Sequence, residues 1–134
     1  EKFKFKLNIL SPRSLIKKHK KIFKNKKFYY SNFCNDFDVA LNNAECVMTD
    51  TWFSMGDKYI KNKKKLLSSF QVNNDIIKKA KKNVIFMHCL PAHRNEEVTD
   101  QVIDGTHSVV WKQAENRMYV QQSILNYLIG DVKK

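Results

Sequence analysis

Three short stretches of the chain combine acidic, basic, hydroxyl and thiol side chains in a spacing that suits ligand binding or catalysis. They read T-D-T-W-F-S-M-G at residues 49–56, F-M-H-C-L-P-A-H-R at residues 86–94, and A-E-N-R at residues 114–117. A carboxylate can bind an ammonium group, and a hydroxyl together with backbone N–H groups can bind a carboxylate. An arginine can stabilise negative charge that develops on an oxygen during a reaction. These stretches therefore contain the candidate functional residues.

A metal site is one alternative for the second stretch, because His88, Cys89 and His93 are all residue types that bind zinc. His88 and Cys89 are adjacent, however, so in an extended strand their side chains point to opposite faces. The sequence offers no further ligands that complete a tetrahedral set. We therefore expect neither a metal nor a cofactor at this site.

The elements that would position these stretches alternate in type along the chain. Short apolar runs predict strands at residues 5–10, 27–31, 45–50, 84–87 and 108–111. Between them, helical spacing of apolar residues predicts helices at residues 15–23, 36–43, 59–69, 72–80, 98–103 and 114–129. This alternation is typical of βα units with a parallel sheet.

In such sheets, ligands bind beyond the carboxyl ends of the strands. The first two stretches begin at two expected strand ends, and Arg117 is expected near the start of the last helix, which Gly130 ends. Ser11 is expected to cap the first helix, with Pro12 in its first turn. The three stretches should therefore meet at one edge of the sheet.

The composition fits one compact domain, because the chain has 134 residues and a hydrophobic content of 43%. No apolar run approaches the roughly 20 residues that a membrane helix needs. Residues 1–6 alternate charged and apolar side chains and do not resemble a signal peptide. The three cysteines lack a CxxC pair, which is typical of a reducing compartment. We expect a cytoplasmic protein that does not bind membranes.

The net charge of +12 raises the alternative of a basic module that binds DNA or RNA. Of the 25 basic residues, however, 22 are lysine and only Arg13, Arg94 and Arg117 are arginine. Proteins that recognise nucleic-acid phosphates and bases favour arginine, because its planar guanidinium group forms two hydrogen bonds at once. A solvated lysine-rich surface is therefore the preferred interpretation, and we expect no nucleic-acid partner. Steeply salt-dependent binding would support the alternative.

Taken in order and spacing, the three stretches resemble the aspartate/ornithine carbamoyltransferase family, and ornithine carbamoyltransferases in particular. The D-x-x-x-S-M-G and H-C-L-P motifs carry the resemblance, and F-Q-V at residues 70–72, E-V-T-D at 97–100 and V-I-D-G at 102–105 extend it over essentially the whole chain. It implies an α/β fold with a three-layer, Rossmann-like parallel sheet flanked by helices. It also implies an enzyme of arginine metabolism that transfers a carbamoyl group from carbamoyl phosphate to L-ornithine, giving L-citrulline and phosphate.

The resemblance implies that Asp50, Ser54 and Met55 bind the α-ammonium and α-carboxylate groups of ornithine, Met55 mainly through its backbone. Cys89 would face the reacting amine, and the carbonyl of Leu90 would orient it. From the residues alone, Asp50 is equally well explained as a cap of the loop after its strand. A lone cysteine such as Cys89 is often a small core residue.

The resemblance further implies that Arg117, together with His88, polarises the carbamoyl oxygen while charge develops on it. From the residues alone, Arg117 could instead be an arginine on the surface of a helix. Asn95 stands where the family usually has glycine, and asparagine tolerates positive φ better than most residues. Ser11-Pro12-Arg13-Ser14 resembles the family's phosphate-binding motif only superficially, because that motif belongs to the other domain.

The resemblance places residues 1–134 in the C-terminal, ornithine-binding domain, incomplete at its N-terminus, with the carbamoyl phosphate domain absent. The parent protein would be a homotrimer. We expect this chain alone to be catalytically inert and to leave part of its last helix exposed, because that helix typically packs on the other domain. A carbamoyltransferase for another amine, such as putrescine, remains an alternative, as does a non-catalytic polyanion-binding domain.

Overall fold

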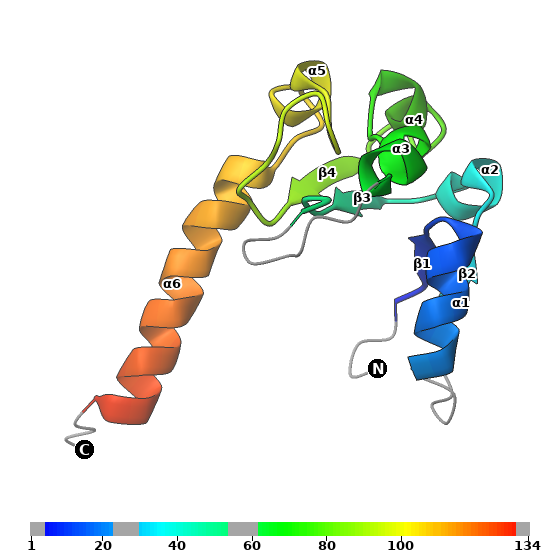
Figure 1. Cartoon of the computed structure of the whole chain (residues 1–134). Helices are drawn as coiled ribbons and strands as arrows, with labels where there is room; N and C mark the ends of the chain where they lie inside the picture. The colour runs from blue at the N-terminus through cyan, green and yellow to red at the C-terminus, as the bar shows by residue number, and fades with distance from the viewer. Residues whose placement is uncertain (1–4, 23–29, 54–61, 131–134) are drawn as a thin grey trace.

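The computed structural model describes residues 5–22, 30–53 and 62–130, with the backbone alone described at residues 18–22. The elements in this part of the chain alternate between strands and helices (Figure 1). They are β1 (Leu7–Leu10), α1 (Arg13–Ile22), β2 (Ser31–Cys34), α2 (Phe37–Leu41), β3 (Cys46–Thr49), α3 (Lys63–Leu67), η1 (Ser68–Phe70), α4 (Asn74–Lys78), β4 (Ile85–His88), α5 (Asp100–Ile103) and α6 (Val110–Ile129).

Every strand pair in the described residues is parallel. β1 pairs with β2, starting with Leu7 opposite Ser31, and β3 pairs with β4, ending with Thr49 opposite His88. The two pairs form separate two-stranded ladders in this part of the chain, and helices connect and flank them. Because parallel strands require crossover connections, this arrangement is the predicted α/β class, with parallel strands flanked by helices.

Two of the short helices begin at the capping residues that the sequence provides. Asp36 precedes α2, and its side chain accepts hydrogen bonds from the N–H groups of Asp38 and Val39. Asn73 precedes α4 and caps it in the same way, with acceptor distances of 3.1 Å. Each cap accepts hydrogen bonds from N–H groups that the first helical turn leaves without a partner. These bonds stabilise a helix of five residues.

Two of the predicted strands were placed wrongly. The second strand lies at Ser31–Cys34, later than residues 27–31, of which 27–29 are outside the described part of the chain. The last predicted strand, 108–111, is reduced to a single parallel bridge between Ser108 and Phe86. Val110 then begins α6 with its side chain fully buried. The apolar run in this segment therefore serves a buried first helical turn instead of a strand.

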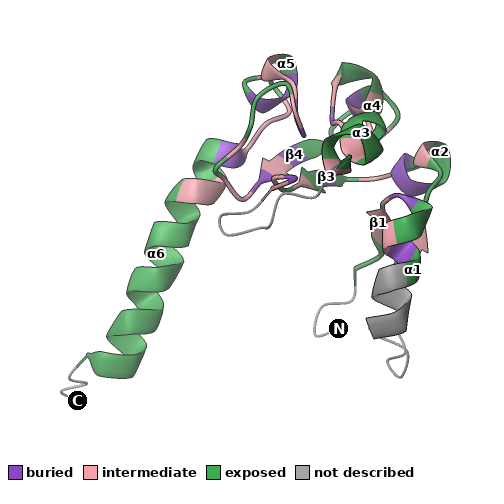
Figure 2. Cartoon of the chain, in the orientation of Figure 1, coloured by how far each residue is buried: buried purple, intermediate pink, exposed green. Residues whose placement is uncertain are grey.

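The hydrophobic core surrounds β4 and consists mainly of branched aliphatic side chains (Figure 2). Phe86 lies at its centre with no exposed surface. Around it are packed Leu41, Val47, Val72, Ile77, Val84, Val98, Val102, Ile103 and Val110. The core thus joins β3 and β4 to α4, to α5 and to the first turn of α6, and it fixes the loops that leave the carboxyl ends of β3 and β4.

Beyond its first turns, α6 extends away from this body (Figures 1 and 2). Most of its large apolar side chains are exposed, as predicted: Trp111, Met118, Tyr119, Val120, Ile124, Leu125, Tyr127, Leu128 and Ile129. Among the residues that the structure describes, no helix is both long and apolar enough to cross a membrane. Exposed apolar surface of this extent is typical of an interaction site.

Candidate functional site

The site begins where β3 and β4 end side by side. Because Thr49 pairs with His88, the next residue of each strand, Asp50 and Cys89, comes to the same edge of the ladder. The Cys89 thiol donates a hydrogen bond to Asp50 Oδ1 over 2.9 Å. The backbone N–H of Thr51 donates to the same oxygen over 2.7 Å. The structure therefore brings together two side chains that lie far apart in the sequence, as the sequence predicts.

This contact sets the protonation of both groups. The thiol of Cys89 and the Thr51 N–H donate to the charged carboxylate, and these hydrogen bonds outweigh desolvation and lower the pKa of Asp50. Burial, followed by the neighbouring Asp50, raises the pKa of the Cys89 thiol against the opposing effect of Arg117. Cys89 is consequently a neutral donor at physiological pH, and its chemistry is that of a binding group and not of a thiolate nucleophile.

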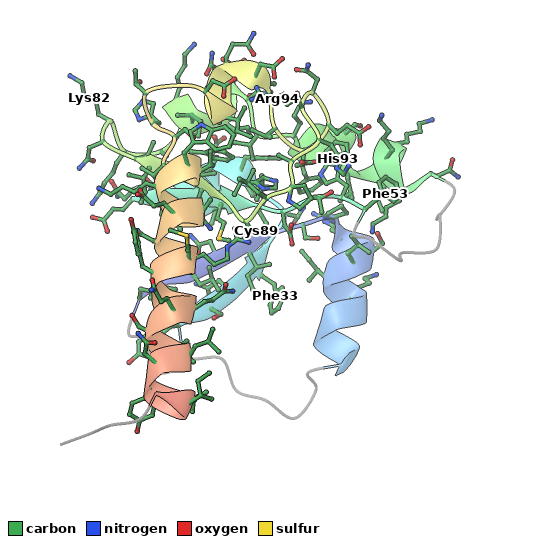
Figure 3. The ribbon with its side chains drawn as sticks, turned by 90° about the vertical axis from the view of Figure 1, so that its left-hand side faces the viewer. Phe33, Phe53, Lys82, Cys89, His93 and Arg94 are labelled. Carbon is green, nitrogen blue, oxygen red and sulfur yellow. The ribbon has the colours of Figure 1, made fainter. Side chains whose placement is uncertain are left out.

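Arg117 reaches the same place from α6. One of its guanidinium nitrogens donates to the backbone carbonyl of Cys89 over 2.6 Å. The guanidinium has five N–H groups, so this bond leaves donors for an oxyanion. Arg117 lies within α6 and not at its start, because the helix begins at Val110. Figure 3 shows Cys89 on the loop beside this helix.

A shallow groove of about 750 Å³ separates the loop after β4 from α6. Leu90 and Pro91 form one wall, and Ala114, Arg117 and Met118 belong to the other. The arginine is exposed and lines a groove that is open to solvent and mainly apolar. A guanidinium in this position can donate charge-assisted hydrogen bonds to an oxyanion.

The chain turns sharply at Leu90. Its φ is 54°, in the left-handed region that leucine rarely adopts, and its peptide bond to Pro91 is cis. Its N–H donates to Nδ1 of His88 over 2.9 Å. A positive φ at a non-glycine residue costs on the order of 1 kcal/mol, so neighbouring contacts must stabilise the turn.

His88 is not placed as the resemblance implies. Its side chain has no exposed surface. Nδ1 accepts from Leu90, and Nε2 lies 3.4 Å from Oε1 of Glu97. Its backbone N–H donates to Gln113 on α6 over 3.1 Å. Because both ring nitrogens face protein atoms in the interior, this geometry does not favour the expected contact between His88 and a carbamoyl oxygen.

Two further residues, Glu97 and His93, hold the loop after β4, and the sequence did not reveal this role for either. Glu97 is fully buried, and its Oε1 accepts from the backbone N–H of His93 over 2.5 Å. The ring Nδ1 of His93 lies 2.8 Å from the hydroxyl of Thr51, which joins the loops after β3 and β4. Two adjacent glutamates predict an exposed segment. The one sequence feature that favours a buried Glu97 is the apolar Val98 that follows it, which is itself buried.

The far side of this loop is held by polar contacts as well. Gln71 donates to the carbonyls of Asn95 and Glu96 over 3.0 and 2.8 Å. Asn95 has a φ of 62°, in the left-handed region that asparagine tolerates better than most residues. Arg94 bridges Asp100 and Asp104, whose carboxylates raise the pKa of the guanidinium further. These contacts shape the loop without reaching the groove.

Two predicted site residues, Ser54 and Met55, lie outside the described residues. Within the described part of the chain, no three histidine, cysteine or acidic side chains are grouped as metal ligands would be. Several surface lysines are paired with carboxylates: Lys64 with Glu96, Lys78 with Asp75, Lys79 with Asp38, and Lys81 with Glu45. This pairing lowers the positive charge that the lysine-rich surface presents to a polyanion.

Comparisons with known proteins agree with the motifs. The profile of the aspartate/ornithine carbamoyltransferase family, Asp/Orn binding domain, matches residues 1–128. An ornithine carbamoyltransferase of Nitrobacter winogradskyi is 44% identical over 131 residues, which cover 97% of this chain and 42% of that protein. One of Bradyrhizobium diazoefficiens is 45% identical over 134 residues, with 99% and 44% covered.

Solved structures are similar over the same range. The ornithine carbamoyltransferase of Pyrococcus furiosus has a TM-score of 0.74 and 37% identity, covering 96% of this chain and 43% of its own. That of Campylobacter jejuni has a TM-score of 0.73 and 29% identity, covering 92% and 43%. The chain thus spans less than half the length of the relatives it matches. On the family match, the chain belongs to the aspartate/ornithine carbamoyltransferase family, as its Asp/Orn binding domain.

Proposed function

We propose that this chain supplies the amino-acid side of an ornithine carbamoyltransferase, which transfers the carbamoyl group of carbamoyl phosphate to the side-chain amine of L-ornithine. The contact that best supports this proposal is the hydrogen bond from Cys89 to Asp50, with Arg117 bound to the carbonyl of Cys89. These contacts join a carboxylate for an ammonium group, a neutral thiol and a guanidinium for an oxyanion, and the guanidinium belongs to a residue that lines the groove. Relatives named ornithine carbamoyltransferase match almost the whole chain.

In the proposed reaction, the lone pair of the ornithine amine attacks the carbonyl carbon of carbamoyl phosphate. The carbon–oxygen bond to phosphate then breaks, and phosphate takes up the amine proton, giving citrulline and phosphate. Asp50 helps to bind the α-ammonium group of the amino acid, Cys89 faces the reacting amine, and the Leu90 carbonyl orients the lone pair. Arg117 stabilises the carbamoyl oxygen as it gains charge. The mechanism requires no metal or cofactor.

Ser54 and Met55 complete the proposal as ligands of the α-carboxylate and α-ammonium groups. His88 enters the proposal as a buried support of the turn at Leu90, because its ring has no exposed surface. The groups that bind carbamoyl phosphate belong to the part of the relatives that this chain does not match. Much of the rate then comes from the alignment of two substrates bound by different parts of the protein.

For the whole protein we propose a cytoplasmic homotrimer that acts in arginine metabolism. The exposed apolar face of α6 supports an assembly in which another part of the protein covers this helix. An isolated 134-residue chain should then form no citrulline. Turnover by that isolated chain would contradict this division of the site.

The test of the proposed function is an assay of the intact protein that contains this chain, with carbamoyl phosphate and each of two amines. We expect citrulline from L-ornithine and little product from putrescine, which lacks the α-carboxylate. Faster reaction with putrescine would assign a different substrate, and no reaction with either amine would overturn the proposal. Binding of DNA that weakens steeply with salt would favour the polyanion-binding alternative.

A further inference from the structure

We propose that Glu97 is a positioning residue for the loop that carries Cys89 and Leu90, and that it acts through the tautomer of His88 and the backbone of His93. The side chains of Glu97 and His88 are polar, yet both are fully buried near the carboxyl end of β4. No role in substrate contact is assigned to Glu97. Its effect on catalysis rests on the proposed function, whereas its effect on His88 does not.

The first step concerns the tautomer of His88. The N–H of Leu90 donates to Nδ1 over 2.9 Å, so Nδ1 must carry a lone pair. The ring proton then belongs on Nε2, which lies 3.4 Å from Oε1 of Glu97. Within the described residues, neither Nε2 of His88 nor Oε2 of Glu97 has a hydrogen-bond partner. Buried polar groups are nearly always paired, so we infer that a small rotation of the carboxyl group lets Nε2–H donate to it.

The second step concerns the loop. Glu97 Oε1 also accepts from the N–H of His93 over 2.5 Å. One carboxyl group thus contacts the residue before Cys89 and a residue after the turn at Leu90. The turn contains a positive φ at leucine, which is unfavourable by itself. The contacts of Glu97 therefore hold the two ends of a strained segment at a fixed distance.

The consequence is specific to one part of the site. Asp50 follows β3, whereas Leu90 and the backbone of Cys89 belong to the loop that Glu97 holds. Loss of Glu97 should displace the groups that face the reacting amine and leave the groups that bind the rest of the amino acid. A displacement of about 1 Å at a reacting group can reduce a rate about a hundredfold.

The first measurement is made on the unchanged intact protein, labelled with ¹⁵N in histidine. Long-range ¹H–¹⁵N spectra assign the tautomer of His88, with His88→Gln to identify its signals. We expect a proton on Nε2 and none on Nδ1 at neutral pH. A proton on Nδ1, or an imidazolium ring, overturns the proposal whether or not the protein transfers carbamoyl groups.

The second measurement compares three variants of the intact protein. Glu97→Gln keeps an oxygen at Oε1, so the tautomer and kcat should be nearly unchanged. Glu97→Met has a similar size but no carboxyl acceptor, so kcat should fall about 10- to 100-fold while KM for ornithine changes less than about threefold. Glu96→Gln is the matched control, because the side chain of Glu96 pairs with the exposed Lys64 and not with His88.

The outcomes separate the alternatives. Unchanged kcat in Glu97→Met overturns the positioning role. An equal loss in Glu97→Gln and Glu97→Met also overturns it, because the charge and not the acceptor would then be essential. If Glu97→Met does not fold, the tautomer of the unchanged protein and the kinetics of Glu97→Gln still decide. A protein that transfers no carbamoyl group fails the proposed function, but the tautomer measurement remains valid.

Discussion

The body around β4 and the outer part of α6 differ in how their positions are determined. In the body, apolar side chains pack around Phe86, and the buried carboxylate of Glu97 accepts a hydrogen bond from the backbone of His93. The outer part of α6 exposes leucine, isoleucine and tyrosine side chains along its length. The body is therefore defined by its own contacts, whereas the outer part of α6 is exposed within the described part of the chain. Arg117 lies at the boundary between the two regions.

The largest expected effect breaks the body itself. In the 134-residue chain, Phe86→Ala should lower the free energy of unfolding by about 3–5 kcal/mol, because it leaves a cavity in a well-packed core. Leu128→Ala is the matched change on α6 and should cost less than about 0.5 kcal/mol, because this side chain is already exposed. Urea unfolding measures both. Equal losses would mean that the two regions are not different. In the intact protein, a larger cost of Leu128→Ala would identify the covering surface.

The next effect tests the boundary. In the intact protein, Arg117→Ala should reduce kcat about 10²- to 10³-fold, because a donor to the developing oxyanion is lost. Arg117→Lys should recover only part of the rate, since a single ammonium group cannot replace the planar fork. Lys112→Ala, an exposed neighbour on the same helix, provides the control. A normal rate in Arg117→Ala would show that the arginine only fastens α6 to the loop.

A smaller effect is expected at the hydrogen bond that joins α6 to β4. Gln113 accepts from the buried backbone of His88, so Gln113→Ala should destabilise the chain by about 1–2 kcal/mol. Gln122→Ala makes the same change at an exposed position of α6 and controls for helix propensity. Thermal unfolding distinguishes them. If the two variants have equal stability, the bond from His88 to Gln113 does not help to hold the start of α6.

The smallest effect concerns pH. The pKa of Asp50 is lowered in the folded chain, so its contribution to stability is present above the unfolded pKa of about 3.9 and is lost as pH falls through the folded pKa. Asp50→Asn should remove this dependence below about pH 4, a change under about 1 kcal/mol because the side chain is exposed. The same variant should speed alkylation of Cys89, whose pKa Asp50 helps to raise. An unchanged acid unfolding curve and alkylation rate would argue against the contact.

The sequence predicted the parts of the site that follow from strand ends. Asp50 and Cys89 each come directly after a strand, and parallel pairing brings such residues together. The predicted strand at 108–111 was wrong because β-branched and aromatic residues suit both a strand and a buried first helical turn. Tertiary packing of Val110 decides between them.

The supporting contacts could not be predicted in this way. Glu97 is buried beside His88 at the end of β4, and the turn at Leu90 between them has a positive φ at a residue that is not glycine. His88 was expected at the substrate for a related reason. Motifs identify residues near a site, but they do not say which face of a strand each residue occupies.

The register of β3 against β4 has a consequence for changes in chain length. Neighbouring strands lie about 4.8 Å apart, and side chains alternate between faces at every residue. Insertion of one residue into Cys46–Thr49 or Ile85–His88 would turn the residue at the strand end to the opposite face and separate Asp50 from Cys89. Insertions in the segments that connect these strands leave the pairing intact. Natural length variation should therefore accumulate between the two strands and be absent within them.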